Sequence, residues 1–143
     1  MTARVRDVMT RDVPAVGPEW HLPDVARLMR DQNLGALPVA EDDELIGIIT
    51  DRDLVVRGIA EGFAAADGRQ ARDVMSGSVL YCFEDQSVED ALQNMGDRQV
   101  RRLPVVDRDR RLVGMVALSD LTRSASASFA VAAKRRMSRA GLH

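Results

Sequence analysis

The chain carries the same plan of segments twice, about 66 residues apart. VRDVMT at residues 5–10 returns as ARDVMS at residues 71–76, and LPV at residues 37–39 returns at residues 103–105. A further block, LIGII at residues 45–49, recurs as LVGMV with one extra residue, which falls in the polar turn before it. Loops tolerate such insertions. Matched blocks in the same order indicate two copies of one supersecondary unit.

Apolar periodicity predicts the order β-α-β-β-α in each copy. In the first copy we expect a helical turn at residues 5–9, an extended piece at 13–16, a helix at 22–33, strands at 37–40 and 45–49, and a closing helix at 51–60. In the second copy we expect the turn at 73–75, the extended piece at 79–82, a helix at 87–98, strands at 103–107 and 111–116, and a helix from 118 to 140.

Each such unit would leave an apolar sheet face uncovered, so the two should pack on each other about a pseudo-two-fold axis. We therefore expect an α+β fold (mixed α/β) with a C-terminal helical extension. The expected organisation is a first repeat at residues 1–62, a linker at 63–70, a second repeat at 71–123 and the extension at 124–143.

Composition narrows the class of protein. The net charge of −2 gives no field that would draw the chain to nucleic acid or to an anionic membrane, and aromatic residues make up only 3%. No apolar run approaches the roughly 18 residues that span a bilayer, and the first residues lack the apolar segment of a signal peptide. Cys82 is the only cysteine, which excludes an intrachain disulfide. These features predict a cytoplasmic protein without a membrane or nucleic-acid partner.

The segment LIGIITDRDL, residues 45–54, reads as a buried strand that ends at the start of a helix. Gly47 inside the apolar run suggests that another part of the backbone approaches closely. Thr50 followed by Asp53 fits a capping box, in which each residue satisfies a backbone N–H of the other. This structural role needs no ligand, and it can coexist with a binding role.

These motifs together resemble a tandem pair of cystathionine β-synthase (CBS) domains, the Bateman module. The resemblance rests on the paired VRDVMT and ARDVMS openings, the LPVA and LPVV strands, and the LIGIITDRDL and LVGMVALSDL endings, and it covers nearly the whole chain. It implies a stand-alone CBS protein similar to actinobacterial hypoxia-response proteins. Such modules bind adenosine nucleotides in two clefts between the repeats and often pair as homodimers.

The resemblance implies a first cleft that takes Thr10, Thr50 and Asp53 from the first repeat, with Arg101 and Arg102 from the second. A carboxylate is an acceptor for both hydroxyls of a ribose, and an arginine fork binds two phosphate oxygens at once. This set is complete, so the first cleft is expected to hold a phosphate-bearing ligand.

The second implied cleft takes Ser76, Ser119 and Asp120. The Thr of its motif is replaced by Ala117, and residues 35–36, which match the two arginines of the other cleft, are Gly and Ala. Without a cation, this cleft is expected to be weaker or to take a nucleoside. The implied function is a non-enzymatic sensor of an AMP-, ADP- or ATP-like ligand, with no required cofactor and with an effector protein as partner.

Other interpretations remain open. The scaffold can serve as a nucleotide-free structural or stress-response dimer, and the incomplete second motif favours this alternative. Cys82 on a strand fits a buried apolar residue, although an exposed thiol of depressed pKa would indicate a redox or metal sensor. His21 and His143 lie too far apart to suggest a metal site. The C-terminal apolar stripe at residues 125–140 fits either a cap on its own module or a dimer contact.

Overall fold

The chain forms two compact units in a computed structural model that describes residues 3–62, 68–96 and 101–126. One unit holds Asp12–Leu80 and Asp109–Leu112, and we call it the Asp53 unit. The other holds Met1–Arg11, Tyr81–Arg108 and Val113–His143, and we call it the Asp120 unit. Each has buried apolar residues of its own.

A β-hairpin forms the centre of the Asp53 unit. Strand β1 (Ala36–Glu41) pairs antiparallel with β2 (Glu44–Thr50). The two turn residues, Asp42 and Asp43, have φ values of 52° and 67°. Positive φ at both positions matches the twist of the flanking strands, and Asp accepts this conformation better than bulky residues do.

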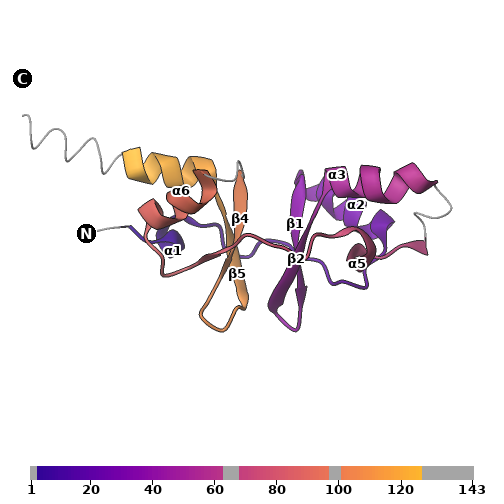
Figure 1. Cartoon of the computed structure of the whole chain (residues 1–143), viewed down its shortest axis with the longest axis horizontal. Coiled ribbons are helices and arrows are strands. Elements are labelled where there is room, and N and C mark those ends of the chain that lie inside the picture. The colour runs from indigo at the N-terminus through magenta and orange to yellow at the C-terminus, as the bar shows by residue number, and fades with distance from the viewer. Residues whose placement is uncertain (1–2, 63–67, 97–100, 127–143) are drawn as a thin grey trace, which may run out of the picture. The chain divides into compact units, whose positions relative to one another are not determined.

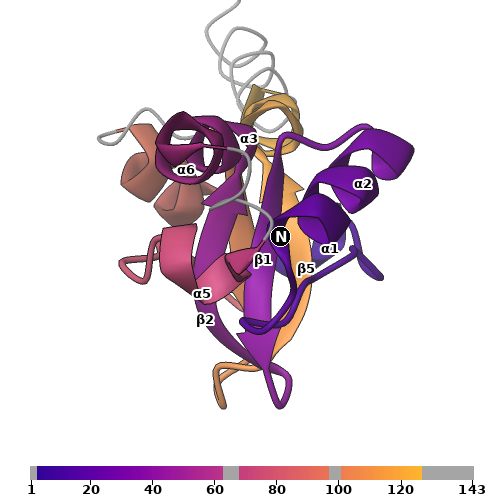
Figure 2. The ribbon, with the colours of Figure 1, turned by 90° about the vertical axis from the view of Figure 1, so that its right-hand side faces the viewer.

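Helices cover one face of this hairpin (Figures 1 and 2). They are α2 (Leu22–Gln32), α5 (Ala71–Val74) and a closing helix that begins as α3 (Asp51–Asp53), widens into the π-helical turn η1 (Leu54–Gly58) and ends as the 3-10 turn η2 (Ile59–Glu61). Their apolar sides meet the strands in one core, formed by Val16, Leu22, Val25, Met29, Leu37, Val39, Ile49, Leu54, Ala71 and Val74.

A three-stranded sheet organises the Asp120 unit. Its order is β3 (Cys82–Phe83), β4 (Arg102–Val106) and β5 (Leu112–Ala117), and β3 runs parallel to β4. Helices α1 (Val5–Val8) and α6 (Val88–Gly96) belong to the same unit, and residues 118–126 are helical. The fully buried residues here include Val5, Val88, Ala91, Val105 and Leu121.

The opening segments of the two sequence repeats are exchanged between the units. Helix α1 comes from the first repeat but lies beside β5 of the second, and α5 from the second repeat lies beside β2 of the first (Figure 1). Thr10 and Met115 exchange backbone hydrogen bonds of 2.8 and 3.0 Å, and Ser76 and Ile48 exchange bonds of 2.9 and 3.0 Å. Each unit is therefore built from both repeats.

A glycine in each second strand makes this exchange possible. A Cβ built on Gly47 would lie 2.9 Å from the backbone oxygen of Ser76, and a Cβ on Gly114 would lie 2.6 Å from that of Thr10. Met75 and Met9 cover the same two glycines with their sulfur atoms. The close backbone approach predicted at Gly47 is thus confirmed, and the opening segment of the other repeat is what approaches.

Most predicted elements are confirmed within the described residues. The first long helix ends at Gln32, and Asn33 terminates it in the left-handed conformation with φ of 54°. The predicted cap of the second long helix is present, because the backbone N–H of Asp90 donates to Ser87 Oγ at 3.1 Å. The predicted continuation of the last helix from residue 127 to 140 lies outside the described residues.

Of residues 13–16, Val16 joins the sheet through a parallel bridge to Val39, and Pro14, which lacks an N–H, stays outside the ladder as an extended piece with a proline should. Two expectations were wrong in detail. The second extended piece was expected at residues 79–82, but strand β3 begins at Cys82. Residues 79–80 still belong to the Asp53 unit, and the segment of the Asp120 unit begins at Tyr81. The closing helix is α-helical only in its first turn, since apolar periodicity does not distinguish α from π winding.

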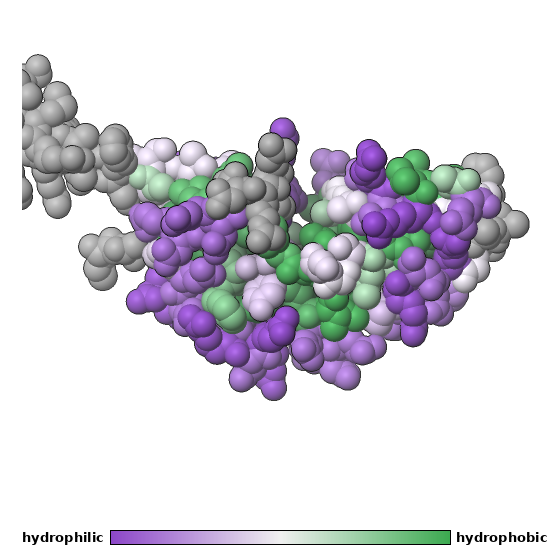
Figure 3. Space-filling model, in the orientation of Figure 1, coloured by the Kyte–Doolittle hydropathy of each residue, from purple (hydrophilic) through white to green (hydrophobic). Residues whose placement is uncertain are grey.

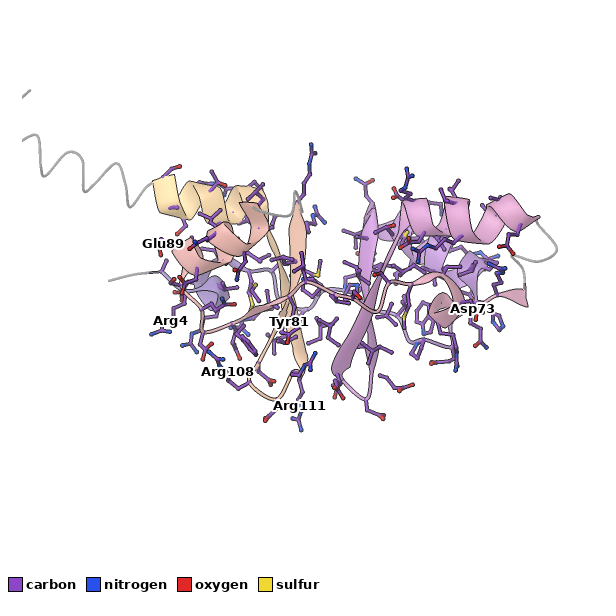
Figure 4. The ribbon with its side chains drawn as sticks, in the orientation of Figure 1. Arg4, Asp73, Tyr81, Glu89, Arg108 and Arg111 are labelled. Atoms are coloured by element: carbon purple, nitrogen blue, oxygen red, sulfur yellow. The ribbon has the colours of Figure 1, made fainter. Side chains whose placement is uncertain are left out.

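A polar cluster holds α1 in the Asp120 unit. Arg108 binds both carboxylate oxygens of Asp85, at 2.9 and 2.7 Å, and its guanidinium carbon lies 4.2 Å from the centre of the Phe83 ring. Arg4, at the start of α1, donates to the backbone oxygen of Asp85 at 2.5 Å, from the same side of the unit (Figure 4). The hydrogen bond from Arg108 lowers the pKa of Asp85 below its ordinary value.

We predict that Gly47→Ala destabilises the protein by about 1–3 kcal/mol, since the new methyl group would overlap a backbone oxygen that cannot move without breaking the bridge to Ile48. Urea denaturation measures the effect. Gly77→Ala is the matched control, because no atom lies within 4 Å of its Cβ position. Equal unfolding midpoints for the two variants would contradict the proposed role of Gly47.

Candidate functional site

Thr50 and Asp53 form the reciprocal capping box that the sequence suggested. The backbone N–H of Asp53 donates to Thr50 Oγ1 at 3.1 Å, and the backbone N–H of Thr50 donates to Asp53 Oδ2 at 2.9 Å. The other carboxylate oxygen, Oδ1, lies 3.9 Å from Arg57 Nε. The structural role is thus confirmed, while Oδ1 takes no part in the cap.

Ser76 lies in the same unit as Thr50 and Asp53. Its backbone is bonded to Ile48, two residues before Thr50 on β2. The order of the sequence led us to group Thr10 with Thr50 and Asp53, and Ser76 with the second motif. The structure groups them the other way within each unit, because the opening segments are exchanged.

Thr10 correspondingly lies beside the second motif, through its bridge to Met115 on β5. The closing helix of this unit starts after Ala117, which has no side-chain oxygen to cap it. The carboxylate of Asp120 accepts a hydrogen bond from Arg123 Nη2, at 3.2 Å from Oδ1. The two motif aspartates are therefore held differently: Asp53 by a backbone N–H, and Asp120 by an arginine side chain.

A cavity of about 700 Å³ opens where β4 begins and the last helix starts. The backbone N–H of Leu118 donates to the carbonyl of Arg101 at 2.7 Å, which fixes these two segments against each other. The volume lies within the range of small-molecule sites. The residues that line it are Arg101, Arg102, Ala117, Leu118, Ser119, Thr122 and Arg123.

A second cavity of about 350 Å³ belongs to the same unit and is lined by Val8, Asp120, Arg123 and Ser124. Arg123 borders both cavities. Three arginines and Ser119 thus line the larger cavity, and Asp120 lines the smaller one. Sequence reasoning had left the second motif without a cation.

Arg123 and Thr122 were missed because they stand outside the motif spacing that guided the sequence analysis. Their position one turn after Ser119 on a helix was a usable signal, since residues three and four apart share a helix face. At the matching place in the Asp53 unit, the carbonyl of Gly35 accepts from the backbone N–H of Asp51 at 2.9 Å.

Cys82 is fully buried on β3, as expected of an apolar residue, and its Sγ lies 3.9 Å from the carbonyl oxygen of Pro104. Burial raises the pKa of this thiol to about 12. The redox interpretation required an exposed thiol of depressed pKa, so its condition is not met. Among the described residues, no group of His, Cys, Asp and Glu is arranged to hold a metal ion. No helix in the described ranges has the length and apolar character needed to cross a bilayer.

Comparison with known proteins identifies the family. The CBS domain family matches residues 5–58 and 71–127. The chain is 43% identical to the CBS domain-containing protein YhcV of Bacillus subtilis over 118 residues, covering 82% of this chain and 81% of that one. It is 40% identical over 122 residues to Hypoxic response protein 1 of Mycobacterium tuberculosis, covering 82% of each chain. The chain therefore belongs to the CBS domain family and carries two CBS domains in tandem.

Solved structures agree with this assignment. The crystal structure of Hypoxic Response Protein I with two coordinated zinc ions matches with a TM-score of 0.75 and 37% identity, covering 85% of this chain and 98% of that one. The structure of CBSX2 in complex with AMP matches with a TM-score of 0.74 and 29% identity, covering 85% and 95%. The mixed helix and strand content of both units is the α+β fold of these neighbours.

We predict that Cys82 resists a thiol reagent such as iodoacetamide at pH 8 while the protein is folded, because the reactive thiolate is nearly absent when the pKa is about 12. Labelling followed by mass spectrometry should show slow modification in buffer and rapid modification in urea. Equally fast labelling in both conditions would contradict the buried position on β3.

Proposed function

We propose that this protein is a non-enzymatic sensor that binds an adenine nucleotide of the AMP, ADP or ATP type. The observation that carries the proposal is the cavity of about 700 Å³ bordered by Arg101, Arg102 and Arg123. Clustered guanidinium groups bind the oxygens of phosphates through paired hydrogen bonds. Support also comes from a structural neighbour, CBSX2, whose complex with AMP is known.

The remaining chemistry of the site suits a nucleotide. Ser119 lines the same cavity and offers a hydroxyl, and Asp120 in the adjoining cavity offers a carboxylate to a ribose diol. Thr10 is held near this end of β5 by its bridge to Met115. In the Asp53 unit, Thr50, Asp53 and Ser76 form the corresponding set, and Asp53 Oδ1, which lies outside the cap and 3.9 Å from Arg57 Nε, is the oxygen proposed to accept from a ligand hydroxyl.

A sensor acts by changing the population of conformations. A bound nucleotide shifts the equilibrium between two states only by the difference in its affinity for them. We propose that an effector protein reads this shift, that the protein works in the cytoplasm, and that no cofactor is required.

The test is thermal denaturation of nucleotide-free protein with AMP, ADP and ATP at millimolar concentration. A ligand at 100 times its dissociation constant adds about 2.7 kcal/mol, which raises the unfolding temperature by several degrees in a chain of this size. Arg102→Ala should reduce the shift given by AMP far more than any shift given by adenosine. No shift with any nucleotide would refute the proposal.

The role of Asp53 is separable from its cap. Asp73 makes the same capping contact in α5, where it accepts from the backbone N–H of Gln70 at 2.9 Å. Asp53→Ala and Asp73→Ala should therefore lose similar cap stability, about 1 kcal/mol. Only Asp53→Ala should also weaken nucleotide binding. Equal binding by the two variants would remove Asp53 from the proposed site.

A second candidate function is a structural homodimer that acts through protein partners. One observation favours it: Val55, Val56 and Ile59 of the closing helix are 55%, 51% and 42% exposed. Green atoms mark this apolar patch over the helix in Figure 3. Apolar residues gathered on one exposed helix face are typical of an interface.

We expect the protein to run as a dimer in light scattering coupled to gel filtration, and Val55→Glu with Val56→Glu to shift it toward the monomer, because a carboxylate is costly to bury in an apolar contact. Both positions are exposed, so the fold should be kept. Thr122→Glu is a control on another exposed helix position. A dimer unaffected by the paired change would place the interface elsewhere.

A further inference from the structure

Arg123 occupies a position that none of the sequence motifs singled out. It borders the cavity of about 700 Å³ that Arg101 and Arg102 line, and it also borders the cavity of about 350 Å³ that contains Asp120. A single side chain thus faces both the basic compartment and the acidic one. Any ligand that fills both compartments must meet it.

In the structure this guanidinium is paired with the carboxylate. Arg123 Nη2 lies 3.2 Å from Asp120 Oδ1, three residues earlier on the helix. The arginine side chain is 77% exposed and that of Asp120 is 30% exposed. An ion pair this open to water is weak, because solvent and salt screen it. A ligand can therefore displace it at small cost.

The other motif aspartate shows what Asp120 lacks. A backbone N–H within its own capping box holds Asp53, and that donor cannot leave without unwinding the helix. The donor to Asp120 is instead Arg123, a long side chain on rotatable bonds. Asp53 also has an arginine nearby, since Arg57 Nε lies 3.9 Å from its Oδ1, but its other carboxylate oxygen keeps the backbone donor.

We propose that Arg123 makes the Asp120 unit selective for phosphate-bearing ligands over nucleosides. When a nucleotide enters, its phosphate joins the guanidinium of Arg123 to those of Arg101 and Arg102, and Asp120 is released to accept hydrogen bonds from the ribose. An uncharged nucleoside must compete with Arg123 for the same carboxylate, and it has no phosphate to bind the displaced guanidinium. This inference rests on the proposed function, whose site it makes more specific.

The expected changes in binding affinity follow from the two kinds of contact that Arg123 makes, one with phosphate and one with Asp120. Loss of one charge-assisted hydrogen bond to phosphate at an exposed position should weaken ATP binding about tenfold. Removal of the competing ion pair should strengthen adenosine binding by up to about threefold. The preference for ATP over adenosine should then fall by more than tenfold in Arg123→Ala.

Isothermal titration of the full chain with ATP and with adenosine, at low ionic strength, tests the proposal on the wild type and on Arg123→Ala. Arg27→Ala is the matched control, because Arg27 makes an exposed ion pair of the same spacing with Asp24, at 2.8 Å, in the other unit. It should leave both affinities unchanged. The double variant Asp120→Asn with Arg123→Ala should not show the stronger adenosine binding that is expected of Arg123→Ala alone.

The outcomes separate the two proposals. If ATP binds the wild type and the preference over adenosine is the same in Arg123→Ala, the role of Arg123 is refuted and the proposed function stands. If Arg27→Ala changes the preference as much as Arg123→Ala does, the effect is one of net charge and the selective role is refuted too. If neither ligand binds the wild type, both proposals fail.

Discussion

The structure depends on two short backbone bridges, each of which passes over a glycine. Gly47 leaves room for Ser76 to pair with β2, and Gly114 leaves room for Thr10 to pair with β5. These backbone bonds join each opening segment to the strand that it lies beside, Ser76 to β2 and Thr10 to β5. The same bridges bring a hydroxyl-bearing residue to the end of each strand where a motif aspartate begins the next helix.

Holding the two aspartates in different ways gives one scaffold two kinds of site. The cap at Asp53 is part of the helix, so this carboxylate is fixed in place before any ligand arrives, with one oxygen already used. Asp120 is restrained only by a side chain and has an adjacent basic cavity. A carboxylate that is already fixed in place loses little freedom when a ligand binds. Where an arginine must first leave the carboxylate, binding of the phosphate to that arginine is coupled to binding of the ribose to the carboxylate.

The sequence carried most of the fold because the repeat set the order of the elements, and caps such as Ser87 and Asn33 fixed their ends. Close approach at Gly47 was also predictable, since glycine within a β-branched strand is costly without a reason. The identity of the approaching segment was not predictable, because both opening segments have nearly the same sequence and fit either glycine. Arg123 was missed for another reason: its spacing from Ser119 places it on the same helix face, but the cavity wall that it shares with β4 is seen only in the structure.

The exchange of opening segments has a consequence for synthesis on the ribosome. Most of the Asp53 unit lies within one continuous stretch, Asp12–Leu80, and can begin to fold while the chain is still being made. Helix α1 emerges before this stretch, yet its partner Met115 emerges only after it. Closing a loop of that length is slow compared with local helix formation. Helix α1 is thus translated before the Asp53 unit but finds its place after it, and until then its buried residue Val5 is open to chaperones.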